Sequence, residues 1–319
     1  MGDTNAPDAP MIDVCGLRKT YPGGVEAVKA IDFQVAPGEV FGLLGPNGAG
    51  KSTTIGMLTT TIIPSGGSAR VSGFDVVTDP IGARQASAIV FQDAAVDRSL
   101  TGWRNLEIHA RLWGVPRSEL QARIGATVEL FGLSDIIGRP VGSYSGGQRR
   151  RLEIARSLVS RPGVLFLDEP TVGLDPRIRY ELLDLIGGLG GGGEMTILLT
   201  THYLDEAERL CGRIAIMHAG EIVALDTPRA LLDSLGTEIV ELRLEADVDA
   251  VLSFLQAQGA AGGDSFTVGS TLTVPLRGGS SRQVIDAVAD FGAAVTATST
   301  RPPTLDDVYL RLTGNRLAA

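Results

Sequence analysis

Residues 45–53 read Gly45-Pro46-Asn47-Gly48-Ala49-Gly50-Lys51-Ser52-Thr53 and match the phosphate-binding pattern G-x-x-x-x-G-K-[ST]. The apolar run Val40–Leu44 precedes them and predicts a buried strand. Residues 54–61 follow and can continue as a helix. Because a phosphate-binding loop lies between a strand and a helix, the sequence predicts an α/β core that binds a phosphorylated ligand.

Each residue type in this loop has a chemical reason. We expect Gly45, Gly48 and Gly50 to turn with positive φ, so that successive backbone N–H groups point at one anion. The N-terminus of the following helix adds a positive dipole end. The Lys51 ammonium can reach the β- and γ-phosphates, and the Ser52 hydroxyl can ligate Mg²⁺.

Length, composition and charge limit the class of protein. A chain of 319 residues is long enough for two domains, and 44% hydrophobic residues with a mean hydropathy of +0.16 predict a well-filled core. No stretch approaches 18 consecutive apolar residues, so we expect no membrane span. Residues 1–10 lack basic residues and predict a disordered tail, not a signal peptide. A net charge of −9 argues against a nucleic-acid partner.

Two cysteines are too few for a disulfide framework. Cys15 and Cys211 also lack metal-ligand spacing, so we expect both to be buried as small hydrophobic residues.

A second apolar run ends in two carboxylates. Residues 164–167 are Val-Leu-Phe-Leu, which predicts a central parallel strand, and Asp168 and Glu169 follow directly. In such sheets ligands bind at the carboxyl ends of the strands. Asp168 would then act as a ligand of Mg²⁺, and Glu169 would orient or deprotonate the attacking water. The alternative is a pair of solvated acids at the end of a strand.

Three further side chains are candidates for the same site. His202 follows the apolar residues 195–201 and could hydrogen-bond a γ-phosphate. Gln92 ends a predicted strand over 88–93 and could ligate Mg²⁺ and position a water, or merely cap that strand. Tyr21 precedes the phosphate-binding loop and could stack on a nucleobase, or pack on its own sheet.

A second potential anion site lies at Ser145-Gly146-Gly147-Gln148, where small residues begin a helix. Arg149, Arg150 and Arg151 follow and could suggest nucleic acid, but a solvated or interface helix face accounts for them, with Leu152, Ala155 and Leu158 turned inward. Farther on, Gly173-Leu174-Asp175-Pro176 predicts a turn before another helix.

Two regions flank or interrupt the core. Residues 100–133 have a helical apolar pattern, broken at 114–116, which predicts an inserted helical subdomain over about 96–155 with Trp103 and Trp113 as packing residues. Residues 236–319 predict a separate α+β module in the order βαββαβ, a ferredoxin-like arrangement. We expect Thr304 and Asp307 to cap its last helix. The core would then span 11–235.

The motifs together resemble the nucleotide-binding subunits of ABC transporters over residues 11–232. The matching positions are Tyr21 (adenine stacking), 45–53 (Walker A), Gln92 (Q-loop), 145–148 (signature), 164–169 (Walker B and catalytic glutamate), Asp175 (D-loop) and His202 (switch histidine). Residues 144–151, 170–177 and 303–310 further resemble the daunorubicin-resistance type of drug-exporter ATPase.

The resemblance implies a P-loop NTPase core and a mechanism. It implies that ATP and Mg²⁺ bind between residues 45–53 of one copy and 145–148 of a second, in a head-to-tail homodimer. Hydrolysis, with Glu169, His202 and Gln92 at the reacting phosphate, would move a separate transmembrane permease docked near Gln92 and residues 100–133. The chain would work at the cytoplasmic face of the membrane, and the permease would export drugs or other small hydrophobic compounds.

Rival functions remain open at this point. One is a soluble ABC ATPase acting on DNA or ribosomes. The absence of a coiled-coil heptad run between Lys51 and Asp168 opposes the DNA type, and the single cassette opposes the ribosome type. An importer ATPase is another, since the cassette does not encode direction. A non-catalytic scaffold is a third, which the intact Glu169 and His202 oppose.

Overall fold

The computed structural model describes residues 9–92, 95–191, 193 and 195–314, so residues 1–8 of the predicted tail and Asp93 of the predicted strand lie outside them. The chain divides into unit 1, Met1–Leu225, and unit 2, Asp226–Ala319. The division falls before the boundary expected at residue 235. Residues 226–235 fall in unit 2 because their helix α8 (Pro228–Asp233) packs against α11 (Leu305–Thr313) of that unit.

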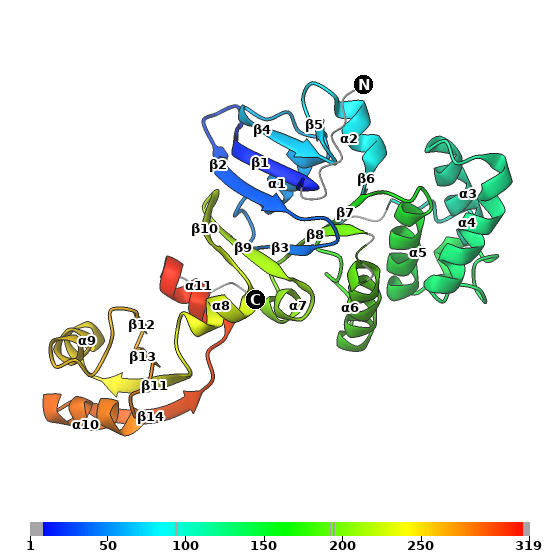
Figure 1. The fold of residues 1–319 in the computed structure, drawn as a ribbon. Helices are drawn as coiled ribbons and strands as arrows, with labels where there is room; N and C mark the ends of the chain where they lie inside the picture. The colour runs from blue at the N-terminus through cyan, green and yellow to red at the C-terminus, as the bar shows by residue number, and fades with distance from the viewer. Residues whose placement is uncertain (1–8, 93–94, 192, 194, 315–319) are drawn as a thin grey trace. The chain divides into compact units, whose positions relative to one another are not determined.

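The main sheet of unit 1 has six strands in the order β10-β9-β3-β8-β7-β6 (Figure 1). Its strands are β3 (Val40–Leu44), β6 (Ser87–Val90), β7 (Val164–Asp168), β8 (Thr196–Thr201), β9 (Arg213–His218) and β10 (Glu221–Asp226). β3 pairs in parallel with β8 and β9, and β7 pairs in parallel with β6 and β8. Every residue of β7 and β8 is buried, as expected for central strands. The carboxyl ends of these strands therefore lie along one edge of the sheet.

A second sheet in unit 1 is antiparallel, in the order β2-β1-β4-β5. Its strands are β1 (Ile12–Thr20), β2 (Glu26–Val35), β4 (Gly66–Val71) and β5 (Phe74–Asp75). One buried apolar cluster joins this sheet to the main sheet and to α1 (Lys51–Leu58), and it includes Ile12, Phe33, Phe41, Ile55 and Phe166. The helix that carries Lys51 is thus fixed between two sheets.

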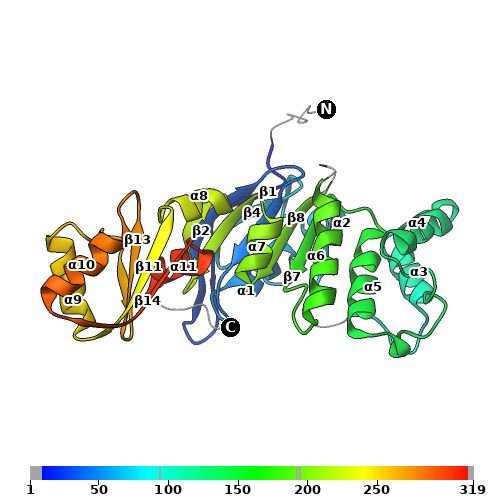
Figure 2. The same ribbon diagram turned by 90° about the horizontal axis from the view of Figure 1, so that it is seen from below.

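The helical subdomain contains α3 (Gly102–Leu112), α4 (Arg117–Leu130) and α5 (Gly146–Leu158), and α3 packs against both of the others (Figures 1 and 2). A short helix η1 (Val141–Ser143) precedes α5. The break expected at 114–116 separates α3 from α4. The remaining helices of the unit's described part are α2 (Pro80–Ala86), α6 (Pro176–Gly191) and α7 (Leu204–Leu210).

The two cysteines differ in exposure. Cys211 is buried as expected, and burial raises the pKa of its thiol. A Cβ at Gly42 of β3 would lie 2.8 Å from its sulfur. Cys15 is exposed on β1, so the prediction that both are buried is wrong for Cys15, because side chains alternate along a strand and Ile12 and Val14 occupy the buried face.

Unit 2 has the predicted βαββαβ order. Its elements are β11 (Glu238–Glu245), α9 (Val248–Ala257), β12 (Phe266–Val268), β13 (Thr271–Leu276), α10 (Ser281–Phe291) and β14 (Ala294–Arg301), followed by α11. The strand order β12-β13-β11-β14 places one strand between the two strands of each βαβ crossover, which is the split βαβ arrangement of ferredoxin-like folds. Thr304 and Asp307 form the predicted capping box at the start of α11.

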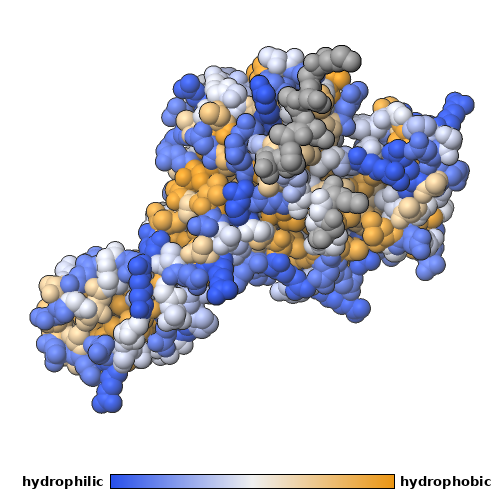
Figure 3. All heavy atoms as spheres, in the orientation of Figure 1, coloured by the Kyte–Doolittle hydropathy of each residue, from blue (hydrophilic) through white to orange (hydrophobic). Residues whose placement is uncertain are grey.

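Apolar side chains gather in patches across the visible middle of unit 1, whereas the visible face of unit 2 is mainly hydrophilic (Figure 3). Across the described residues, each helix is too short or too polar to cross a membrane.

Candidate active site

The loop between β3 and α1 needs its glycines for two different reasons. Gly48 and Gly50 have φ values of 82° and 107°, as predicted. A Cβ at Gly50 would also lie 2.4 Å from the Ala27 carbonyl oxygen. Gly45 does not have a positive φ, so that prediction was wrong. A Cβ at Gly45 would lie 2.4 Å from the carbonyl oxygen of Met217, and glycine is required there by this close approach.

A cavity of about 570 Å³ opens over this loop. The predicted site residues that line it are Tyr21, Pro46, Asn47, Gly48, Gly50, Lys51, Ser52, Thr53, Gln92 and Glu169. Ala49 is buried beneath the loop instead, and Gly45 contributes through its carbonyl oxygen. The cavity therefore joins the phosphate-binding loop to residues that follow β6 and β7.

Lys51 is buried at the floor of this cavity. Its Nζ donates hydrogen bonds to the carbonyl oxygens of Gly45 at 2.7 Å and Pro46 at 3.2 Å. Nζ also lies 3.4 Å from Glu169 Oε1. Burial lowers the pKa of Lys51, and the charge of Glu169 opposes that shift. The ammonium is thus held where phosphate oxygens would replace these acceptors.

Asp168 faces Ser52 across the cavity edge. Ser52 Oγ donates to Asp168 Oδ1 at 3.3 Å, and Thr200 Oγ1 of β8 donates to the same oxygen at 2.6 Å. A hydroxyl and a carboxylate are hard oxygen donors that suit Mg²⁺, which usually keeps waters and phosphate oxygens as its other ligands. Within the part of the chain that the structure describes, no cluster of three or more His, Cys, Asp or Glu side chains forms a metal cage. The donor set therefore fits a magnesium ion shared with a phosphate.

Glu169 has an unusual backbone conformation. Its φ is 46°, in the left-handed region that non-glycine residues rarely adopt. Its N–H donates to Thr200 Oγ1 at 3.0 Å, and its carboxylate lies 3.4 Å from His202 Nδ1. Since a strained backbone at such a position directs the side chain, Glu169 reaches the cavity together with Lys51 and beside His202.

Gln92 lies at the cavity but not at the end of a strand. β6 ends at Val90, so the predicted strand through residue 93 is too long. The carbonyl of Phe91 accepts a hydrogen bond from the Arg150 side chain instead of continuing the sheet ladder. Tyr21 also lies at the cavity, with its hydroxyl 3.5 Å from Thr53 Oγ1.

The other predicted nucleotide contacts do not line this cavity. Ser145, Gly146, Gly147 and Gln148 start α5, where Ser145 Oγ accepts from the Gln148 N–H at 3.2 Å and Gln148 Oε1 accepts from the Ser145 N–H at 2.9 Å. Asp175 Oδ1 accepts from the Ile178 N–H at 3.2 Å at the start of α6. The second predicted anion site of the chain therefore does not line this cavity.

Arg150 was missed by the sequence analysis. The prediction that Arg149–Arg151 form a solvated or interface face is wrong for Arg150, which is only 7% exposed and contacts backbone carbonyls at the ends of β6 and β7. A signal was present, because Arg150 and Glu153 are three residues apart on the helix face that also carries Ile154. Helical spacing would have paired these two side chains, but the spacing alone does not show that the pair is buried.

Several known proteins are similar to this chain over most of its length. Residues 28–172 match the family model described as ABC transporter. The chain is 41% identical over 313 residues to the daunorubicin/doxorubicin resistance ATP-binding protein DrrA of Streptomyces peucetius, covering 95% of this chain and 92% of that protein. It is 36% identical over 312 residues to the Nod factor export ATP-binding protein I of Ralstonia nicotianae, covering 97% and 95%.

Among solved structures, cbiO1 from Clostridium perfringens, described as part of the ABC transporter complex cbiONQ, is similar to this chain with a TM-score of 0.65. The two are 29% identical, and the alignment covers 70% of this chain and 90% of cbiO1.

Proposed function

The chain belongs to the ABC transporter family as an ATP-binding subunit with ATPase activity, and we propose that its ATP hydrolysis drives export of a drug or other hydrophobic compound through a separate permease. The relatives support export, because one is named for drug resistance and another for Nod factor export. The observation that carries the proposal is the meeting of Lys51, Asp168 and Glu169 at one edge of the main sheet.

The motif residues at and beside the cavity have different parts in hydrolysis. Lys51 and the N–H groups of residues 45–53 bind the phosphates and neutralise their charge. Ser52, Asp168 and Gln92 would hold Mg²⁺, which when bound would stabilise the negative charge that develops on the transferred phosphate. Glu169 orients the attacking water and accepts its proton. His202, beside Glu169, donates a hydrogen bond to the terminal phosphate.

The separation of the two anion-binding ends supports a dimer. One copy supplies a cavity with the phosphate-binding loop, while its residues 145–148 lie elsewhere at the exposed start of α5. A second copy in head-to-tail orientation would bring its own residues 145–148 over the first cavity. Each ATP would then lie between two copies, and hydrolysis would reopen the dimer.

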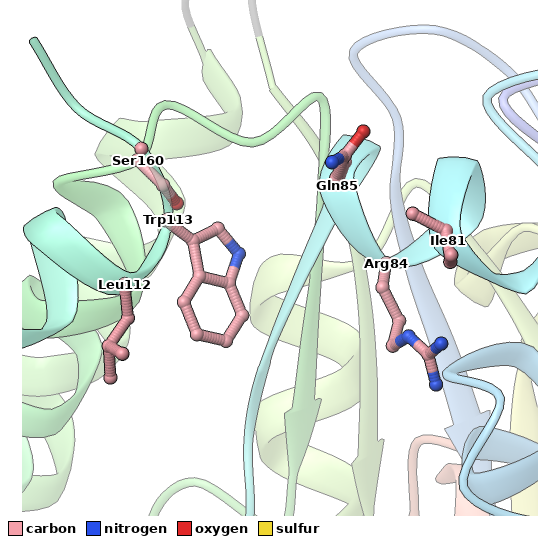
Figure 4. A pocket seen from close by; sticks show the side chains of 7 residues that line it. Ile81, Arg84, Gln85, Leu112, Trp113 and Ser160 are labelled. Atoms are coloured by element: carbon pink, nitrogen blue, oxygen red, sulfur yellow. The ribbon is translucent and has the colours of Figure 1, made fainter.

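A groove in unit 1 is the docking site that we propose for the permease. It has a volume of about 520 Å³ and is lined by Ile81, Arg84 and Gln85 of α2 on one side and by Leu112, Trp113 and Ser160 on the other (Figure 4). Leu112 is 74% exposed and Trp113 is 45% exposed. Apolar side chains exposed together indicate an interaction surface. Trp113 stacks on His109, as expected of a packing residue, and it also lines this groove.

The groove is connected to the catalytic edge along the chain. Helix α2 leads directly into β6, and β6 leads to Gln92 at the nucleotide cavity. A segment of the permease seated beside α2 could therefore move with the segment that carries Gln92. This is the site at which we propose that hydrolysis is coupled to transport.

The first experiment purifies a tagged Glu169→Gln chain from native membranes with Mg-ATP and identifies the proteins that accompany it. We expect a polytopic membrane protein, and ribosomal or DNA-repair proteins without one would contradict the proposal. Leu112→Glu should lose the membrane protein but keep ATPase activity. Leu130→Glu is the matched control, because Leu130 is 53% exposed on α4 and lies outside the groove.

Export itself is tested in drug-sensitive cells that produce this chain with the permease so identified. Cells with the parent chain should accumulate less doxorubicin than cells with Glu169→Gln. Equal accumulation would reject doxorubicin as a substrate, and higher accumulation with the parent chain would reverse the proposed direction.

A further inference from the structure

One buried guanidinium holds together three segments of the catalytic edge. We propose that Arg150 is a positioning residue for ATP hydrolysis, which fixes the backbone of Glu169 and the start of the segment that carries Gln92 in one arrangement. The inference rests on the proposed role of Glu169 as the residue that acts on the attacking water. Arg150 itself touches neither the cavity nor the reacting groups.

The number of donors matches the number of acceptors. Arginine has five N–H donors in a fixed planar fork. In Arg150, Nε donates to the Pro170 carbonyl at 2.7 Å, and Nη1 donates to the Phe91 carbonyl at 2.7 Å and to Glu153 Oε2 at 3.0 Å. The Nη2 group lies 3.3 Å from both the Asp168 and the Glu169 carbonyl oxygens. Each donor thus has an acceptor, and four of the five acceptors are backbone carbonyls.

Three of those carbonyls belong to consecutive residues around Glu169. Residue 169 has a φ of 46°, and this conformation persists only where the surroundings hold it. Arg150 binds the carbonyl oxygens of Asp168, Glu169 and Pro170, and Thr200 Oγ1 accepts from the Glu169 N–H. The strained peptide is therefore bound on both its carbonyl and its amide side.

The fourth carbonyl, that of Phe91, connects Arg150 to the segment that carries Gln92. Phe91 immediately precedes Gln92, so the guanidinium that holds Glu169 also fixes the point at which the Gln92 segment leaves β6. Arg150 itself lies on α5, one turn from Ser145–Gln148. One side chain therefore sets the mutual position of the two residues that face the terminal phosphate.

The charge of Arg150 is compensated inside the protein. Glu153 is buried with it, and the two form an ion pair at 3.0 Å. A buried pair is strongly destabilised when one partner alone is removed, because the other charge stays unpaired. A single substitution would therefore mix a loss of stability with any loss of positioning, and a charge-balanced double substitution separates the two.

The experiment measures kcat and KM for ATP hydrolysis, the Kd for ATP and the melting temperature of Arg150→Gln and of Arg150→Gln/Glu153→Gln. We expect both to lose at least tenfold in kcat, while KM and Kd change less than threefold and the double variant regains most of the melting temperature. Arg150→Lys should not restore kcat, because its three N–H groups share one nitrogen and cannot reach carbonyls from two strands.

The matched control is Arg213→Gln. Arg213 of β9 also binds a carboxylate, Glu39, at 2.7 Å and a backbone carbonyl, Gln34, at 2.7 Å, but it lies at the amino end of its strand. The Arg213→Gln substitution should lower the melting temperature and leave kcat within twofold of the parent. The proposal is overturned if the Arg150→Gln/Glu153→Gln chain has a kcat within twofold of the parent, or if Arg213→Gln loses as much.

A parallel Glu169→Gln measurement separates this inference from the function on which it rests. If Glu169→Gln abolishes hydrolysis while the double variant is fully active, only the role of Arg150 is wrong. If Glu169→Gln hydrolyses ATP like the parent, the role of Glu169 is wrong, and the inference is overturned with it.

Discussion

The two units differ in how many charged side chains they bury. Among the described residues, the charged residues that unit 1 buries are Lys51, Arg150, Glu153, Asp168, Glu169 and Glu206. In unit 2 the corresponding residue is Asp307 alone. Burying a charge is costly unless it is paired, so a unit that buries several at one sheet edge has a use for them there. The difference indicates that unit 1 contains the catalytic site and that the charges of unit 2 serve only its folding.

The largest expected effect tests whether the buried charges of unit 1 are catalytic. Lys51→Gln should reduce ATP hydrolysis at least about 100-fold, because it removes the cation that faces the phosphates. The control removes a cation from unit 2, since Arg301→Gln should leave hydrolysis within about twofold of the parent. ATP hydrolysis is measured by phosphate release. Comparable losses of activity in both variants would contradict the conclusion that only the buried charges of unit 1 are catalytic.

A truncation asks whether unit 2 takes part in nucleotide binding. A chain that ends at Asp226 keeps β10 and the whole nucleotide cavity. We expect its Kd for ATP to change less than about threefold, about 0.6 kcal/mol, while recovery of the complex with the permease falls. Titration with a fluorescent ATP analogue measures the first quantity, and a large loss of affinity with assembly intact would contradict the modular division.

A smaller effect, on stability, is expected from Asp307, the buried acid among the described residues of unit 2. Burial favours a higher pKa for Asp307, but hydrogen bonds from Arg301 and Thr304 outweigh it and hold the pKa below its usual value. Because the folded pKa is depressed, the stabilisation is present above the unfolded pKa of about 4 and is lost as the pH falls through the folded pKa.

Asp307→Asn should therefore cost about 2 kcal/mol at pH 7 and less in strong acid, where the parent loses the same interaction. Calorimetric unfolding between pH 7 and pH 2 measures the difference. A cost that stays constant over this range would show that the ion pair with Arg301 is not its source.

The smallest expected effect is the loss of stability of unit 1 in acid, which we assign to His109. Burial, followed by the charge of Arg156, lowers the pKa of His109 from 6.5 to about 4. The folded state therefore disfavours the proton, and stability should fall as the pH drops from 6.5 towards 4. After allowance for partial exposure we expect about 1 kcal/mol.

Tryptophan emission measures this effect, since both tryptophans, Trp103 and Trp113, belong to unit 1. In His109→Gln the unfolding midpoint in urea should depend less on pH over this range. An unchanged dependence would assign the acid sensitivity to another group.

Sequence patterns predicted the parts of the fold that depend on local order. The apolar runs at Val40–Leu44, Val164–Asp168 and Thr196–Thr201 are strands because unbroken apolar segments are buried on both faces of a parallel sheet. The alternation in residues 238–301 likewise predicted the order of unit 2. The motif residues Lys51, Ser52 and Glu169 lie at one cavity, since each follows the carboxyl end of a parallel strand.

The features that sequence could not supply depend on residues distant in the chain. Gly45 needs to be glycine because of the Met217 carbonyl, and nothing near Gly45 in the sequence indicates that contact. The burial of Arg150 depends on carbonyls from Phe91 and Pro170, which only the assembled sheet brings to one point. Local composition therefore shows which residues are present, and the tertiary fold decides which of them face each other.

The unequal exposure of the two cysteines makes the natural chain a ready-made reporter. A thiol-directed dye would react with Cys15 on the surface of β1 and leave the buried Cys211 untouched. Each copy in a complex would then carry one fluorophore at a known position. Energy transfer between two such copies could follow their approach and separation during a single round of ATP turnover, with no engineered residue in the protein.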